Sequence, residues 1–410
     1  MNGFTSKAIH GITLKKDPHG ALRFPLYDTV AFEAESAHDL ELAFSGKKAQ
    51  HSYSRISNPT VEDFEQKIRL LSNSFGVLAV ASGMAAISEV VLALAGAGSN
   101  VVTSRYLFGN TLSLFESTLG RWGLEVRYAD MTDCASVDAA IDENTRLVFL
   151  EVITNPHLQV ADIAAIVAVA GKRNVPVVLD GTLSTPYLFQ SKNVGVAVEI
   201  ISSTKYISGG ATAIGGVIID NGVFDWKKNP ALADDARKVG PAALMARLRR
   251  EVHRNIGSCM SPHNAWLQVL GLETLALRID RSSANALAVA KYLSSSTLVQ
   301  TVNYPGLVAC PSHAVAARQF GNNFGGILTF ELTSKEKCFA FIDSLKLIRR
   351  ATNLNDNKTL VIHPASTIFV DYTAEARTAM NVSDRLVRLS VGIEDIDDIL
   401  HDVQQGLERL

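Results

Sequence analysis

The sequence predicts an α/β protein in which a mainly parallel sheet, covered by helices, is followed by a smaller α+β domain. Three observations predict this fold. Short β-branched apolar runs alternate with helical segments between residues 75 and 220. The 410 residues exceed the size at which one hydrophobic core stops growing. After residue 221 the chain becomes charged and helical, and the later runs GILTFEL and RLVRLSV alternate as antiparallel strands do.

The elements are expected in this order. Residues 1–57 carry few periodic apolar runs and are expected to form an N-terminal arm. A helix is expected to begin at about residue 58, because Asn58 suits the N-cap, Pro59 the first helical position, and the acidic Glu62 and Asp63 the positive end of the helix dipole.

The strands of the main sheet are expected in the apolar runs that follow. These runs are FGVLAV, NVVTS, RLVFLEV, VPVVLD and VAVEIIS, and the glycine-rich GGATAIGG leads into one more, VIID. We place the main α/β domain at residues 58–257 and the α+β domain at residues 258–410.

Composition excludes several classes of protein. The formal net charge of −2 and the lack of a basic block argue against a nucleic-acid surface. The four cysteines lie far apart without a C-x-x-C pair, which argues against a disulfide framework or a zinc site. Residues 1–20 lack the continuous apolar core expected of a signal peptide, and the apolar stretch 75–99 contains Glu89 with several serines and glycines, so we expect a buried strand–turn–helix there. We expect a soluble, cytoplasmic protein without a membrane contact.

Three predicted strands end in polar or glycine residues. One ends at Asp180, one runs into residues 202–205, and one ends at residues 82–84 before a helix. Ligands of open parallel sheets bind at the carboxyl ends of the strands, so these residues are expected to converge on one pocket. Taken singly, each has a plainer explanation, such as a turn residue, a helix cap or a solvated lysine.

The chemistry of this pocket suits pyridoxal phosphate. Lys205 offers an amine able to form a Schiff base, and Asp180 a carboxylate able to keep a ring nitrogen protonated. An anion is expected to meet backbone N–H groups and hydroxyls there. The candidate residues for that phosphate are Gly83, Met84, Ser202 and Thr204.

Two rival motifs fit less well. Residues 202–205 match the S-x-x-K pattern of penicillin-recognising serine enzymes, but the companion S-D-N and K-T-G motifs both fail, at residues 383–385 and 358–360. The glycines of residues 96–98 follow a helix and precede a strand, which is the wrong order for a dinucleotide-binding turn.

Five motifs together resemble the Cys/Met-metabolism family of pyridoxal-phosphate enzymes. They are YSRISNPT (53–60), ASGMAAIS (81–88), DGTLSTP (180–186), SSTKYISGG (202–210) and VRLSVGIEDIDDIL (387–400). They occur in order over nearly the whole chain. The resemblance implies the aminotransferase-like fold type I of PLP-dependent transferases, and a homo-oligomer, usually a tetramer built from active dimers.

The resemblance also implies roles for individual residues. Lys205 would bind the cofactor covalently and move protons, with Asp180 at the pyridine nitrogen. Further cofactor residues would be Thr182, Gly83, Met84, Phe108, Ser202 and Thr204, with Tyr53 and Arg55 reaching the phosphate from the neighbouring subunit. Tyr53 would also assist proton transfer. The substrate residues would be Arg388, as a two-pronged clamp on the carboxylate, Asn155 and Asn353.

Two stretches, 349–367 and 257–278, look most like the O-acetylhomoserine sulfhydrylases of this family. The implied reaction replaces the γ-acetoxy group of O-acetyl-L-homoserine by sulfur, giving L-homocysteine and acetate in methionine biosynthesis. Cystathionine γ-synthase and methionine γ-lyase are the alternatives, and a non-catalytic binding protein is a more distant one. The sulfur donor (sulfide, a thiol or a carrier-protein thiocarboxylate) and the choice of acetyl or succinyl ester stay open.

The sequence departs from the family pattern at three positions. Phe108 stands where the family usually has a tyrosine stacked on the cofactor ring, and it still offers a ring but no hydroxyl. Gly181 replaces the usual asparagine after the aspartate, and Gly210 replaces a common histidine after the lysine. These departures leave the finer contacts to the cofactor open.

Overall fold

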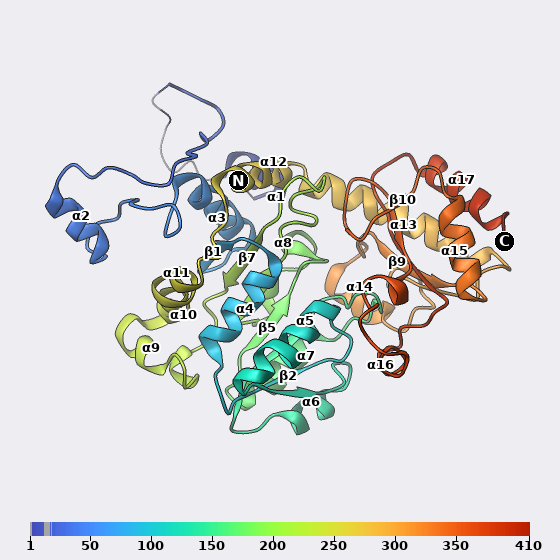
Figure 1. Ribbon diagram of the computed structural model, residues 1–410, viewed down its shortest axis with the longest axis horizontal. Helices are drawn as coiled ribbons and strands as arrows, with labels where there is room; N and C mark the ends of the chain where they lie inside the picture. Colours follow the sequence, from blue (N-terminus) through green and yellow to red (C-terminus); the bar gives the residue numbers. More distant parts are fainter. Residues whose placement is uncertain (1, 12–16, 18) are drawn as a thin grey trace.

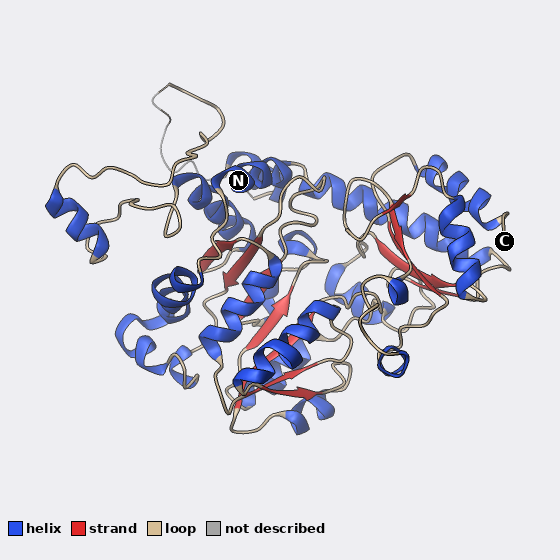
Figure 2. Cartoon of the chain, viewed as in Figure 1, coloured by secondary structure: helices blue, strands red, loops and turns tan. Residues whose placement is uncertain are grey.

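The structure, a computed structural model, describes residues 2–11, 17 and 19–410. Within these residues the strands form two sheets, one of seven strands in the order β1-β7-β6-β5-β4-β2-β3 and one of five in the order β10-β11-β12-β9-β8 (Figures 1 and 2). The strands of the large sheet are β1 Gly76–Val80, β2 Asn100–Thr103, β3 Glu125–Tyr128, β4 Thr145–Glu151, β5 Val177–Asp180, β6 Val198–Ile201 and β7 Gly216–Asp220.

The large sheet is parallel except at β7, which runs antiparallel to both of its neighbours, β1 and β6. The strand expected at VIID is therefore present, with its direction reversed. Only residues 202–215 connect β6 to β7, and they contain no helix, so the chain turns back antiparallel instead of crossing over. The predicted mainly parallel α/β sheet is confirmed.

Helices cover both faces of the large sheet. Successive residues of each strand point to opposite faces, so Val178 packs in the core cluster under α4, whereas Val177 and Leu179 pack in the cluster that contains α7. A third cluster joins α1, α3 and α12 to the β1 and β7 end of the sheet. The helices of this part are α1 Phe4–His10, α3 Pro59–Ser72, α4 Gly83–Leu94, α5 Gly109–Ser113, α6 Cys134–Ala140, α7 Ile163–Lys172, α8 Thr185–Leu188, α9 Ala233–Val239, α10 Ala243–Arg247, α11 His253–Ile256 and α12 Pro262–Glu273.

The small sheet is antiparallel apart from the pair β10–β11, as the alternating runs predict. Its strands are β8 Thr301–Asn303, β9 Ile327–Glu331, β10 Arg349–Arg350, β11 Leu360–Ile362 and β12 Leu386–Ser390. Its helices are α13 Leu275–Ser295, α14 His313–Phe320, α15 Lys335–Ser344, α16 Ala374–Ala379 and α17 Ile396–Leu407. One continuous apolar cluster runs from the large sheet through α13 into this sheet, so the two parts share a core.

Part of the N-terminal arm lies away from the body of the molecule. α1 packs against α3 and α12, whereas further along the arm the chain extends away from the body and carries the short α2, Ala37–Phe44, which buries no residue (Figure 1). It returns at the predicted helix start, where the Asn58 side chain caps α3 by accepting a hydrogen bond from Thr60 N at 2.9 Å and Pro59 opens the helix. In the part of the chain that is described, no helix is both long and apolar enough to cross a membrane.

Candidate active site

The strand ends that were expected to converge do lie together. The turn that opens α4 touches the end of β6, because a Cβ on Gly83 would stand 2.6 Å from the Ser202 Cβ. The Ser82 side chain caps α4 by accepting from Ala85 N at 3.1 Å. Only a glycine allows this approach, and it leaves the first N–H groups of a 12-residue helix beside the Ser202 hydroxyl. This is the kind of site that binds a phosphate.

Thr182 links the ends of β5 and β6. Its backbone N–H donates to Asp180 Oδ1 at 2.9 Å, and its hydroxyl accepts from Ser202 N at 2.8 Å. Desolvation at the strand end raises the pKa of Asp180, and the hydrogen bonds from Thr182 oppose that shift. The Thr182 N–H therefore fixes the Asp180 carboxyl in place, and a cationic partner would favour its ionised form.

Lys205 lies in the turn after β6 and is half-buried. Its Nζ donates to Asn353 Oδ1 at 2.8 Å, and Asn353 in turn donates to Asp356 at 3.0 Å. Desolvation and the positive charge of Arg388 lower the pKa of Lys205. Thr204 turns its hydroxyl to the Gly215 carbonyl at 3.1 Å and accepts from Gly215 N at 3.0 Å, so in this structure it braces the turn that carries the lysine.

Arg388 comes from the small sheet, in the middle of β12, and is only 2% exposed. One guanidinium nitrogen donates to Asn155 Oδ1 at 2.9 Å, and another to the carbonyls of Thr352 and Asn353 at 3.2 and 3.1 Å. Its Nε has no partner, and burial lowers the pKa of the group to about 10. The two sheets thus bring Lys205, Asn353, Arg388 and Asn155 into one network.

Glu151, at the end of β4, belongs to this site, and the sequence reading missed it. It pairs in register with Asp180 on the neighbouring strand, and its carboxylate accepts from Phe108 N at 2.6 Å and from Asn155 N at 3.1 Å. The signal was present, since the run RLVFLE ends in an acidic residue as VVLD does. Phe108, half-buried at the N-terminus of α5, is thereby fixed to the same strand edge.

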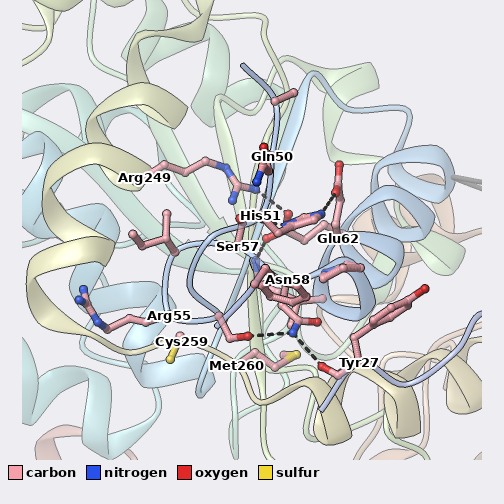
Figure 3. A pocket seen from close by; sticks show the side chains of 18 of the residues that line it. Tyr27, Gln50, His51, Arg55, Ser57, Asn58, Glu62, Arg249, Cys259 and Met260 are labelled. Carbon is pink, nitrogen blue, oxygen red and sulfur yellow. Dashed lines mark hydrogen bonds and ion pairs between the residues drawn. The ribbon is translucent and has the colours of Figure 1, made fainter. Parts of the chain in front are cut away.

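Tyr53 and Arg55 are not joined to this network within one chain. Tyr53 is 40% exposed and pairs with Ala31 of the arm, and Arg55 stacks over the Tyr53 ring and donates to the Arg254 carbonyl at 2.6 Å. Arg55 also lines a cavity of about 1100 Å³ between the arm and α3 (Figure 3). Lys205 does not line that cavity, so the cavity under the arm is separate from the strand-end site.

A buried carboxyl explains the glycine at position 181. A Cβ there would stand 2.1 Å from Glu199 Oε1. Glu199 is 1% exposed, and its other oxygen accepts from the Ser191 hydroxyl at 2.6 Å. Burial is the main cause that raises the pKa of Glu199 to about 8. The space of a side chain at position 181 is therefore already filled from β6, on the face of the sheet opposite Asp180.

We expect Gly181→Ala to lower the free energy of unfolding by about 1–3 kcal/mol, because the added methyl must displace a buried, hydrogen-bonded carboxyl. Urea denaturation of the apoprotein measures this loss. Gly171→Ala is the matched control: a Cβ at that position of α7 meets no atom within 4 Å, so stability should hold or rise. A Gly181→Ala protein as stable as the wild type would contradict the packing described here.

The groups at the strand ends match the requirements of pyridoxal phosphate. Lys205 supplies an amine with a lowered pKa, Asp180 a carboxylate for a protonated ring nitrogen, and the Gly83–Ser202 approach an anion site at a helix N-terminus. The phosphate site and the carboxylate come from strands on either side of β6, with the lysine after β6 itself. The donor set therefore fits this cofactor.

Comparisons with known proteins agree with a pyridoxal-phosphate site. The family model described as Cys/Met metabolism PLP-dependent enzyme matches residues 5–408. The O-acetyl-L-homoserine sulfhydrylase of Corynebacterium glutamicum is 36% identical over 425 residues, which cover 100% of this chain and 97% of that protein. The L-methionine gamma-lyase of Pseudomonas putida is also 36% identical, over 410 residues, with coverage of 100% and 98%.

Two solved structures are similar over most of their length. A protein from Campylobacter jejuni described as an O-acetylhomoserine (thiol)-lyase has a TM-score of 0.93 at 33% identity, with 98% of this chain and 99% of that one covered, and carries N′-pyridoxyl-lysine-5′-monophosphate at its position 205. The O-acetylhomoserine sulfhydrylase of Wolinella succinogenes has a TM-score of 0.78 at 50% identity, with coverage of 86% and 99%. This chain therefore belongs to the Cys/Met metabolism family of PLP-dependent enzymes.

Proposed function

We propose that this enzyme catalyses γ-replacement on O-acetyl-L-homoserine with a sulfur nucleophile and so forms L-homocysteine and acetate. The observation that carries the proposal is the position of Asn353, whose side chain accepts from Lys205 Nζ and whose carbonyl accepts from Arg388. Asn353 belongs to the stretch 349–367 that resembles the sulfhydrylases. The 50% identity to the Wolinella succinogenes sulfhydrylase supports the same reaction.

The residues divide the work as follows. Lys205 would bind the cofactor and carry protons, Asp180 would pair with the ring nitrogen with Thr182 close by, and Phe108 would offer its ring to the cofactor. Arg388, oriented by Asn155 and Asn353, clamps the α-carboxylate of the substrate. Gly83, Met84, Ser202 and Thr204 would hold the phosphate, and Tyr53 and Arg55 of a neighbouring subunit would complete that site in a tetramer of active dimers.

The cofactor supplies an electron sink that stabilises negative charge at the substrate carbons next to it. Lys205 Nζ, with its pKa lowered by desolvation and by Arg388, takes the proton from Cα and later returns one. Phe108 has no hydroxyl, so proton transfer falls to Lys205 and to the partner's Tyr53. In the net reaction the Cγ–O bond to acetate breaks, and a Cγ–S bond to the incoming sulfur forms.

The second candidate is γ-elimination, which gives 2-oxobutanoate and ammonia from the same substrate position. The observation that favours it is the L-methionine gamma-lyase of Pseudomonas putida, which matches this chain at the same 36% identity as the Corynebacterium glutamicum sulfhydrylase. The two reactions share the first proton transfer, so the fate of Cγ decides between them.

The deciding experiment incubates the purified holoenzyme with O-acetyl-L-homoserine alone, with sulfide, and with L-cysteine. We expect homocysteine to be the main product with sulfide. Mainly 2-oxobutanoate in all three reactions would make the enzyme a lyase, and cystathionine formed from L-cysteine would make it a cystathionine γ-synthase. O-succinyl-L-homoserine in a parallel series tests the leaving group.

A further inference from the structure

We propose that Glu151 is a positioning residue of this site, holding both the aromatic ring of Phe108 and the Asn155–Arg388 pair in place relative to Lys205. The inference rests on the proposed roles of Phe108 and Arg388. It concerns how these two groups are held relative to each other, since Phe108 and Arg388 share no direct hydrogen bond and are linked through Glu151 and Asn155.

The geometry is that of one carboxylate with two backbone partners. Glu151 Oε1 accepts from Phe108 N at 2.6 Å, and Oε2 accepts from Asn155 N at 3.1 Å. The two N–H groups belong to loops that follow different strands, β2 and β4, and 43 residues separate Phe108 from Glu151. A carboxylate offers an acceptor on each oxygen, and no neutral side chain of similar size offers two such acceptors and no donor. Glu151 therefore joins the two loops.

The link continues through Asn155 to the substrate clamp. The backbone of Asn155 is held by Glu151, and its side-chain oxygen accepts from the Arg388 guanidinium at 2.9 Å. Arg388 lies on the small sheet, so this chain of bonds fixes a residue of β12 to the end of β4. A shift of the 152–155 loop would move the guanidinium away from the position set by the Thr352 and Asn353 carbonyls.

The surroundings of Glu151 favour a functional use over simple packing. The residue is 7% exposed, and burial, followed by the charge of Asp180, raises its pKa to about 8, whereas the N–H groups of Phe108 and Asn155 favour the ionised form and oppose that shift. A second carboxylate beside Asp180 is costly to bury, and an apolar side chain would fill the strand end without that cost. The two N–H groups that Glu151 binds explain why a carboxylate occupies this position.

The test compares holoenzymes of the wild type and Glu151→Gln at a pH above 8, where Glu151 is a carboxylate with an acceptor on each oxygen. The amide keeps the size of the side chain but offers one acceptor and turns a donor toward the second N–H group. Visible circular dichroism of the bound cofactor reports the tilt of the ring. Titration with L-norvaline measures how well Arg388 binds an α-carboxylate, since norvaline has that group but no leaving group. We expect a changed dichroic band per bound cofactor and a norvaline Kd raised by about fivefold or more.

Glu199→Gln is the matched control, because it makes the same change in an equally buried carboxyl on the opposite face of the sheet, and it should leave both readouts unchanged. Lower thermal stability of Glu151→Gln with a wild-type dichroic band and norvaline Kd would overturn the proposal and leave a purely structural role. If Glu151→Gln does not fold, Glu151→Asp, with a shortened carboxylate, takes its place and should change both readouts in the same direction.

Asn155→Ala separates the two branches of the link. If Glu151 acts on the clamp through Asn155, the effects of Glu151→Gln and Asn155→Ala on norvaline binding should be less than additive. Fully additive effects would contradict that route. Neither readout depends on the fate of Cγ, so a product analysis that favours the lyase reaction would refute the proposed function without deciding the role of Glu151.

Discussion

Replacing Lys205 by alanine is expected to lower turnover of O-acetyl-L-homoserine by at least about 10³-fold, because in the proposed mechanism Lys205 both attaches the cofactor covalently and moves the Cα proton. The fold should survive, since the Lys205 side chain makes a single hydrogen bond, to Asn353. The measurement is kcat for product formation together with the absorption spectrum of added pyridoxal phosphate, which should show no covalent linkage to the variant.

Lys192→Ala is the matched control. Lys192 is also half-buried and also donates from Nζ to a single oxygen, the Asn73 carbonyl at 2.7 Å, but it lies in the segment Ser191–Val194, outside the strand-end site. The turnover of the Lys192→Ala variant should equal that of the wild type. If Lys205→Ala kept more than about a hundredth of the wild-type rate, the loss would be smaller than removal of a general base produces, and Lys205 would not be the base.

The strand-end residues could be predicted from the sequence because their placement follows from a local rule. In a parallel sheet the carboxyl ends of strands share one edge, so Asp180, Ser202 and the turn at Gly83 had to lie near one another once the strands were recognised. The structure confirms that proximity through Thr182 and the Gly83–Ser202 approach. The reversed direction of β7 does not disturb it, because the sheet order still places β1 two strands from β6.

The site residues that the small sheet and its loops contribute could be predicted only from the family resemblance. Nothing in the pattern RLVRLSV distinguishes Arg388 from an exposed strand arginine, and its partners Asn155, Thr352 and Asn353 are all distant from it in sequence. Asn353 lies in a segment without regular structure between β10 and β11, where periodicity carries no information. Tyr53 and Arg55 stay predictions, since their expected partner is another subunit.

The two buried glutamates were missed for a shared physical reason. Glu151 and Glu199 lie inside apolar runs that read as buried strands, and the pattern that identifies the strand hides the one charged residue in it. Their partners are distant in sequence: Glu151 accepts from Phe108, and Glu199 fills the space at Gly181. The departure at Gly181 was visible in the sequence, but its cause was a contact that only the folded sheet reveals.

Arg388→Lys is expected to raise KM for O-acetyl-L-homoserine by about 10²-fold, because a lysine keeps the charge but loses the planar fork that binds a carboxylate with two hydrogen bonds. The variant also loses the bonds that tie the guanidinium to Asn155 and to the Thr352 and Asn353 carbonyls. A single ammonium group must then satisfy all three of these hydrogen-bond acceptors. Steady-state kinetics with saturating sulfide measure the effect.

Arg388→Gln distinguishes binding from electrostatics. The positive charge of Arg388 contributes to the lowered pKa of Lys205, so removing it should raise that pKa and move the acidic limb of the kcat/KM profile to higher pH. Arg388→Lys, which keeps the charge, should leave the limb in place. Arg385→Lys, at an exposed arginine that pairs with Glu331 just before the same strand, is the control for both and should match the wild type. Equal pH profiles for the glutamine and lysine variants would show that Arg388 acts on the substrate carboxylate alone, without tuning the lysine.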